Sequence, residues 1–187
     1  FIQLDTSYDT KRVAPESNDS LRPSKVAVTK GQYGSNGETI FSIRPSTLGV
    51  KGAINHGQAD IKTWLEFDLL DSGSGANSPA FHLRQAWFEY ENIGVGQTHT
   101  GFMNINVFPN SVQYWGPVGM VFTRKAQIRY TWQLAQDEVA VSIERAGGSI
   151  DTQGLSDSTQ YKAQYPDLIA FYKGNEAWGQ WKLAGLL

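Results

Sequence analysis

The chain has 187 residues, of which 40% are hydrophobic and 12% aromatic, and its formal net charge is −2. It contains no cysteine, which excludes disulfides, thiolate metal sites and a cysteine nucleophile. A charge this close to zero provides no overall basic field for nucleic acid, and apolar runs no longer than LIAFY at 168–172 exclude a transmembrane helix.

Alternation of apolar and polar residues runs through the chain and predicts β-strands. It is clearest in 60–71, where Leu65 and Phe67 share one face while Lys62 and Glu66 share the other. The apolar parity changes within 39–54, which predicts a β-bulge near 45–47, where Pro45 would be tolerated. In chain order, strands are expected at 1–9, 39–54, 60–71, 81–91, 93–101, 122–134, 138–146, 167–173 and 176–187.

The connections between these segments alternate strictly between long and short. Long loops rich in Gly, Ser, Asn, Asp and Pro are expected at 10–38, 72–80, 102–121 and 147–166. Short turns are expected at 55–59, near 92, at 135–137 and at 174–176. Bacterial outer-membrane barrels have this pattern, with short periplasmic turns and long extracellular loops. The expected fold class is therefore all-β, a transmembrane antiparallel up-and-down β-barrel of porin type, with a soluble β-sandwich as the alternative.

Residues 1–187 are expected to form a single, partial barrel domain. About nine strands are predicted, whereas single-chain bacterial barrels have even numbers of strands. Phe1 already lies in a strand-like pattern, and the final segment, WKLAGLL at 181–187, stops without a turn signal. We therefore expect the chain to be a stretch of a longer barrel.

Several short sequence motifs follow one another between residues 81 and 152. They are FHLRQAW at 81–87, VGQT at 95–98, NVFPNSVQYWGPVGMVF at 106–122, RKAQIRYT at 124–131 and SIDT at 149–152. The segment 106–122 is the most specific of them. In these motifs the chain resembles the DcaP-like porins, outer-membrane channels associated with dicarboxylic acids.

The resemblance implies a particular assembly and function. It implies a homotrimer of barrels with roughly sixteen strands each, of which this chain supplies a part. The expected location is the outer membrane of the Gram-negative type, with outer-membrane lipid and lipopolysaccharide as surroundings. Small anionic solutes such as dicarboxylates would diffuse through it passively. No catalysis, cofactor or nucleic-acid partner is expected.

The loop at 102–121 is the first candidate for a functional element. General porins fold the corresponding loop into the lumen and narrow it. Phe108, Tyr114 and Trp115 would let it pack stiffly against the inner wall, so we expect a constriction loop. A surface loop with a small aromatic core of its own is the alternative.

Four arginines are candidates for anion selection. Arg44, Arg84 and Arg129 are predicted to face away from the apolar side of their strands, and Arg124 follows the loop. Arginines gathered at a constriction would select anions and pair with carboxylates in a bidentate manner. The alternative is that each arginine is neutralised by a carboxylate of the wet wall, with Glu66, Asp68, Glu89 and Glu144 as the candidates. His82 has the parity of Arg84 and is also a candidate for lining the pore.

The other aromatic and titratable residues predict less. His56, His82 and His99 are scattered, with no metal-ligand spacing and no motif for a Ser–His–acid site. Trp64 shares the parity of Lys62, which would place it in the lumen. The remaining aromatics are expected to form interfacial girdles or to pack against neighbouring residues: Tyr8, Trp87, Tyr130, Trp132, Tyr172, Trp178 and Trp181.

The sequence therefore predicts a passive outer-membrane pore for small anions. A sugar-selective porin and a soluble all-β carbohydrate-binding module are the alternative functions.

Overall fold

In the computed structural model, the described residues are all of 1–187 except 16–17, 19–24, 57–58, 71–78, 109–120 and 148–162. They contain ten strands and one short 3-10 helix, Ile105–Val107. The strands are β1 (Asp5–Asp9), β2 (Glu38–Ser42), β3 (Leu48–His56), β4 (Ala59–Asp68), β5 (His82–Tyr90), β6 (Ile93–His99), β7 (Arg124–Leu134), β8 (Asp137–Glu144), β9 (Asp167–Glu176) and β10 (Gly179–Leu186).

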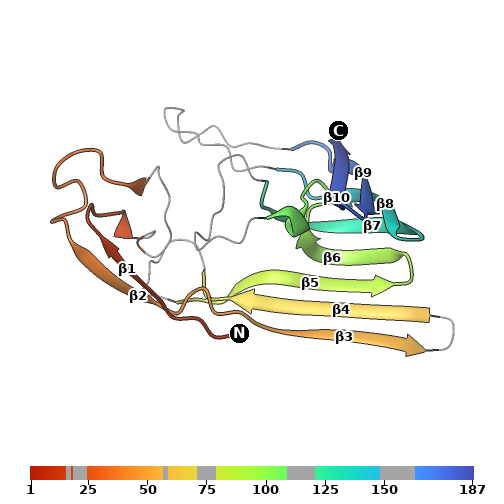
Figure 1. Ribbon diagram of the computed structural model, residues 1–187, viewed down its shortest axis with the longest axis horizontal. Helices are drawn as coiled ribbons and strands as arrows, with labels where there is room; N and C mark the ends of the chain where they lie inside the picture. The colour runs from red at the N-terminus through yellow and green to blue at the C-terminus, as the bar shows by residue number, and fades with distance from the viewer. Residues whose placement is uncertain (16–17, 19–24, 57–58, 71–78, 109–120, 148–162) are drawn as a thin grey trace. The chain divides into compact units, whose positions relative to one another are not determined.

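These strands form two sheets (Figure 1). Strands β1 and β2 pair antiparallel in a two-stranded sheet, and β3 to β10 follow one another in sequence order across an eight-stranded sheet. Consecutive strands lying side by side make an up-and-down meander, as the alternation of long and short connections predicted. The all-β antiparallel fold is thus confirmed.

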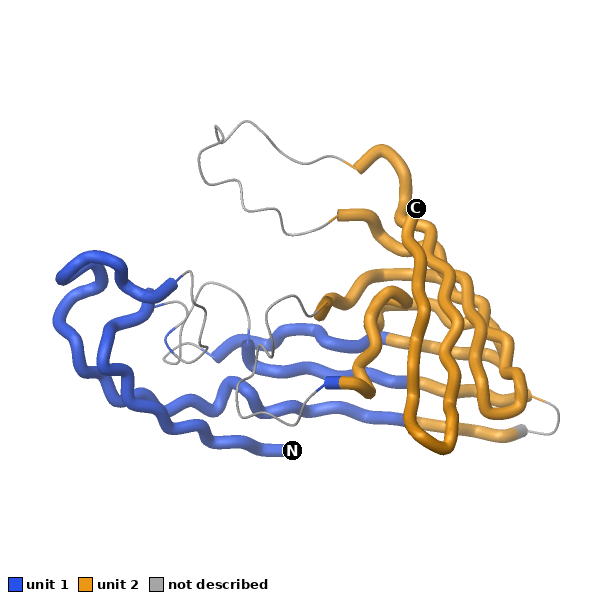
Figure 2. Tube along the Cα trace, turned by 45° about the horizontal axis from the view of Figure 1, so that its top comes forward, with its two compact units in different colours: residues 1–51, 64–86, 108–120 blue, residues 52–63, 87–107, 121–187 orange. Residues whose placement is uncertain are grey.

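The chain divides into two compact units, coloured in Figure 2. Unit 1 contains Phe1–Lys51, Trp64–Ala86 and Phe108–Met120, of which the described residues include the β1–β2 sheet. Unit 2 contains Gly52–Thr63, Trp87–Val107 and Val121–Leu187, and with them strands β6 to β10. Each unit is described by itself below.

In unit 2, the register places apolar and polar residues on opposite faces of the sheet. Ile128 lies opposite Val95 and Ile143, and these three side chains are 58%, 45% and 53% exposed. We call this side, which also carries Tyr130 and Val141, the apolar face. Apolar side chains that are exposed along several neighbouring strands are what a lipid-facing barrel wall requires.

The opposite side of these strands is the polar face. It carries Arg129, which lies opposite Ser142, and Gln127, which lies opposite Glu144. Ser142, Gln127 and Glu144 are buried in spite of their polarity, together with the apolar Ile169 and Phe171. Burial on the polar face means that another part of the chain covers it, and that part is the segment following β6.

Two sequence predictions about the strands are wrong. The single strand with a bulge expected at 39–54 is two strands, β2 and β3, in different sheets. A turn at Arg44 and Pro45 separates them, in which the Ser46 amide donates to the Ile43 carbonyl at 2.9 Å. Proline has no amide hydrogen for the sheet ladder, so the chain turns there instead of bulging. The ten described strands thus exceed the nine expected by one.

The turn expected at 174–176 is also wrong, since β9 runs to Glu176 and the turn lies at Ala177 and Trp178. Gly174 has a packing role instead of a turn role. A Cβ on it would come within 2.5 Å of the Trp181 ring. The turns expected near 92 and at 135–137 are confirmed at 91–92 and 135–136, while 57–58 lie outside the described residues.

Over the described ranges, none of the helices has the length and apolarity needed to cross a membrane.

Candidate channel wall and constriction

Arg129 projects from β7 onto the polar face and is held from several sides. Its Nη2 donates to the His99 carbonyl at 2.7 Å and to Gln127 Oε1 at 2.7 Å, and its Nε donates to the same Gln127 oxygen at 3.0 Å. The guanidinium carbon lies 5.5 Å from the centroid of the Trp87 ring and 5.7 Å from that of Phe171. Two aromatic faces and two oxygen acceptors therefore fix this cation, leaving Nη1 without a hydrogen bond to any described residue.

A second cation lies against the same phenylalanine. Lys182 Nζ is 3.6 Å from the centroid of the Phe171 ring and donates to the Met103 carbonyl at 2.9 Å. Within the described residues, neither Lys182 nor Arg129 has a carboxylate oxygen within 4.0 Å. Two cations without an ion-pair partner thus flank one ring on the polar face of unit 2.

The other cations on this face are neutralised. Lys125 pairs with Asp167, and Lys173 pairs with Glu138 at 3.7 Å. Such pairs make no net contribution to the sign of the local field. Arg129 and Lys182 are thus the two cations of this face for which no ion pair with a described residue is found, and Glu144 is a carboxylate of the same face that binds an amide and a hydroxyl instead of a cation.

The segment that covers the polar face is the loop base, residues 101–107. The Gly101 amide donates to Glu144 Oε1 at 2.8 Å, and the Ser142 hydroxyl donates to the same oxygen at 2.8 Å. Gly101 packs so tightly that a Cβ on it would come within 3.2 Å of both Ile169 and Phe171. The loop expected at 102–121 thus begins on the polar face of β8 and β9.

Further along the loop base, Met103 is buried and its carbonyl accepts the hydrogen bond from Lys182. The short helix Ile105–Val107 follows. Tyr114 and Trp115, which were expected to stiffen the loop, lie outside the described residues. Phe108 is half-buried and belongs to unit 1.

In unit 1, Arg84 belongs to an ion-pair network. Its Nε donates to Glu66 at 2.7 Å and its Nη1 donates to Asp68 at 2.7 Å. Asp68 is 2% exposed, and its other oxygen lies 2.9 Å from His82 Nδ1 and accepts from the Leu70 amide at 3.0 Å. Arg84 and His82 thus share a face with carboxylates, and Arg84 is neutralised by them.

The geometry thus consists of an exposed apolar face, a polar face with charged side chains, and a loop segment lying on that polar face. A family model described as DcaP outer membrane protein matches residues 2–176. The chain belongs to this family. The match covers most of the chain and confirms the resemblance found in the sequence motifs.

A solved structure agrees with the DcaP fold. The chain is similar to the structure entitled "Crystal structure of the outer membrane channel DcaP of Acinetobacter baumannii", with a TM-score of 0.77 and 20% identity. The similarity covers 98% of this chain and 53% of the other, so this chain spans about half of that channel. A comparison with curated proteins found no match. DcaP membership places the chain in the outer membrane, with the fold of a channel.

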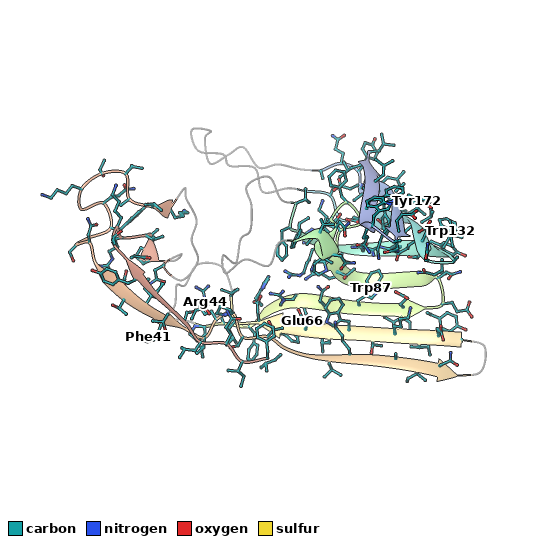
Figure 3. All side chains as sticks on the ribbon, in the orientation of Figure 1. Phe41, Arg44, Glu66, Trp87, Trp132 and Tyr172 are labelled. Carbon is teal, nitrogen blue, oxygen red and sulfur yellow. The ribbon has the colours of Figure 1, made fainter. Side chains whose placement is uncertain are left out.

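The two remaining arginine candidates of this DcaP chain differ from Arg129. Arg44 is 3% exposed, and its Nε donates to the Leu69 carbonyl at 3.2 Å, which ties the turn after β2 to the residue after β4 (Figure 3). Arg124 begins β7 opposite His99, and its guanidinium lies 4.9 Å from the centroid of Phe122. Strand alternation puts Arg124 on the apolar face, opposite to Arg129.

Trp87, labelled in Figure 3, packs against neighbouring residues, which is one of the two roles expected of it. It lies beneath Arg129, its Nε1 donates to Glu89 at 3.3 Å, and its ring covers Gly94 on the polar face. Trp64 has the polar surroundings that its parity predicted, with its Nε1 donating to Glu66 at 3.1 Å.

Four of the other aromatic residues pair with one another. Tyr130 and Trp132 have ring centroids 4.5 Å apart, and Tyr172 stacks on Trp181 at 5.2 Å. Trp132 and Tyr172 lie near the same ends of β7 and β9 (Figure 3). Trp178, in the turn between β9 and β10, is exposed.

Sequence reasoning missed Lys182 and Phe171 as parts of the site. The parity of β10 carried a signal for Lys182, which lies between the apolar Trp181 and Leu183. Glu144 was expected as a possible ion-pair partner of an arginine, but it accepts from a backbone amide 43 residues away, which no local pattern indicates. In the part of the chain that the structure describes, no three His, Asp or Glu residues gather as metal ligands would.

Proposed function

We propose that the chain contributes to an outer-membrane channel through which small anionic solutes diffuse passively, with dicarboxylates as the preferred class. The observation that carries this proposal is the pair Arg129 and Lys182, two cations on the polar face without an ion-pair partner among the described residues. Charged side chains lining a pore select ions by sign.

The arrangement of the pair favours a solute with two carboxylates. The Arg129 guanidinium and the Lys182 ammonium group both lie within 6 Å of the centroid of the Phe171 ring. Arg129 Nη1 is available to a carboxylate, and Lys182 uses one described hydrogen bond of its three donors. Two cations close to one ring match a solute that carries two carboxylates.

The loop base supports a constriction near this pair. Residues 101–107 lie on the polar face, and Met103 accepts a hydrogen bond from Lys182 itself. A segment in this position narrows the lumen beside the two cations, so that a passing anion comes close to them. We further propose that the channel is a homotrimer in outer-membrane lipid and lipopolysaccharide.

The exposed apolar face argues against the soluble carbohydrate-binding module. Ile128 and its cross-strand neighbours would be exposed to water in such a protein, whereas a lipid bilayer accommodates them. A sugar-selective channel would need no unpaired cations, and the test below distinguishes it from an anion channel.

The test is the reversal potential of the full-length channel in planar bilayers under a salt gradient. Arg129→Gln and Lys182→Met should each lower the anion-to-cation permeability ratio about fourfold, from roughly 0.8 kcal/mol of attraction at about 5 Å in water. Lys30→Met, which removes an exposed lysine before β2, is the control and should leave the ratio unchanged.

Block of chloride current by a four-carbon dicarboxylate should weaken in the same two variants. A parent channel with no preference for anions would refute the proposed selectivity, and maltose block without an anion preference would indicate the sugar channel. Equal anion preference in all variants would remove the role assigned to this pair.

A further inference from the structure

The apolar face of unit 2 carries a groove at the end where the long connections lie. Its volume is about 360 Å³, and its lining includes Val95, Ile128, Ile143, Arg145 and Pro166. The first three come from β6, β7 and β8 and point away from the polar face. An open apolar groove that runs across three strands fits an extended hydrocarbon chain.

Arg145 lies at the rim of this groove. Its backbone amide donates to the Ala126 carbonyl at 2.8 Å, which continues the pairing of β7 with β8 by one residue. Alternation from Ile143 then puts its exposed side chain on the apolar face. The side chain makes no hydrogen bond or ion pair with another described residue.

A second arginine lies on the same face at the same end. Arg124 is two residues from Ala126 on β7, so it and Arg145 are diagonal neighbours on adjacent strands. The acidic residues at this end of β8 and β9 face the other way. Glu144 binds the Gly101 amide, and Asp167 pairs with Lys125, both on the polar face.

The groove thus has an apolar floor and a basic rim. The rim lies where β8 enters a long connection, at the end opposite the two-residue turn 135–136. Long connections mark the extracellular side of an outer-membrane barrel. The lipid of that leaflet is lipopolysaccharide, whose lipid A part carries acyl chains below phosphate groups.

We propose that this surface is a binding site for lipopolysaccharide, with an acyl chain of lipid A in the groove and a lipid A phosphate on the exposed Arg145, next to the positive charge of Arg124, whose Nε and Nη2 are buried. Guanidinium groups bind phosphate in a bidentate manner, and the acyl chain covers Val95, Ile128 and Ile143. The site is on the outside of the wall, so it is independent of the proposed anion selectivity.

The experiment measures lipid A retained by the full-length channel in detergent, by native mass spectrometry and by titration. Arg145→Ala should weaken binding of hexa-acylated, bis-phosphorylated lipid A about tenfold, the loss expected for one charge-assisted partner. Ala126→Phe, which places an apolar ring over the groove, should also weaken it. Lys173→Ala removes the same charge from the polar face and should bind like the parent.

The lipid and ion arms separate the possible sources of binding. Dephosphorylated lipid A should bind equally to the parent and to Arg145→Ala, and inorganic phosphate at millimolar concentration should not displace lipid A. Parent-like binding of bis-phosphorylated lipid A by Arg145→Ala would overturn the proposal. Equal binding of phosphatidylglycerol vesicles and lipid A would overturn lipopolysaccharide as the occupant.

Discussion

Glu144 holds the loop base against the wall, so its replacement should release that segment. The carboxylate is 1% exposed, and one of its oxygens accepts from both the Gly101 amide and the Ser142 hydroxyl. The other oxygen, Oε2, has no hydrogen-bond partner among the described residues. Glu144→Ala therefore removes the only acceptor that the Gly101 amide has among the described residues.

The expected increase in the released population follows from the energetic cost of leaving the Gly101 amide without an acceptor. Gly101 is buried, and a buried donor left without an acceptor costs about 1–3 kcal/mol. Released from the wall, the loop base would expose the amide to water and recover this energy. The released population should therefore rise about 5- to 150-fold. Glu144→Gln keeps an acceptor oxygen at the same position and should retain most of the attachment.

The assay is single-channel recording of the full-length channel in planar bilayers. Glu144→Ala should show a larger mean conductance and more current noise than the parent, while Glu144→Gln should stay close to the parent. Glu138→Ala is the matched control, because Glu138 lies on the same strand and face but pairs with Lys173. Parent-like traces from Glu144→Ala, or equal noise from the Ala and Gln variants, would refute the role of this hydrogen bond.

Two further substitutions test the packing and charge of the wall. Gly94→Ala would place a Cβ 1.9 Å from the Trp87 ring, so it should destabilise the folded channel by about 1–3 kcal/mol. The measurement is urea unfolding in detergent. Gly185→Ala is the control and should have no effect, because a Cβ there has no neighbour within 4 Å. Arg84→Met would leave the buried Asp68 carboxylate without its cation and should lower the free energy of unfolding by about 3–5 kcal/mol. Adding Asp68→Asn should restore part of this loss. If the losses of the two single variants simply add in the double variant, the pairing is contradicted.

The faces of single strands could be predicted because side chains alternate with a period of two. Ile128, Tyr130 and Arg129 lie on the faces that their parity indicated. The partner of a strand is not encoded in its own alternation. Alternation therefore predicted one strand over 39–54, although the turn at Arg44 and Pro45 follows β2 and the chain continues in another sheet.

The candidate site could be predicted by residue type but not by neighbourhood. Arg84 and Arg129 look alike in sequence, since both lie on the polar side of a strand. They differ in what the register brings beside them: Asp68 reaches Arg84, whereas Gln127 and the His99 carbonyl reach Arg129. Such cross-strand neighbours depend on register over tens of residues, which local pattern does not specify.

The ring of Trp87 lies flat over Gly94, and the ring of Trp181 over Gly174, in each case where a methyl group would collide with it. In each pair, the large side chain on one strand fills the space that a side chain at the glycine of the neighbouring strand would occupy. Over evolutionary time, neither member can change freely while the other stays. Among DcaP relatives, a large aromatic at the first position should occur with glycine at the second, and a bulkier second residue should accompany a smaller first one.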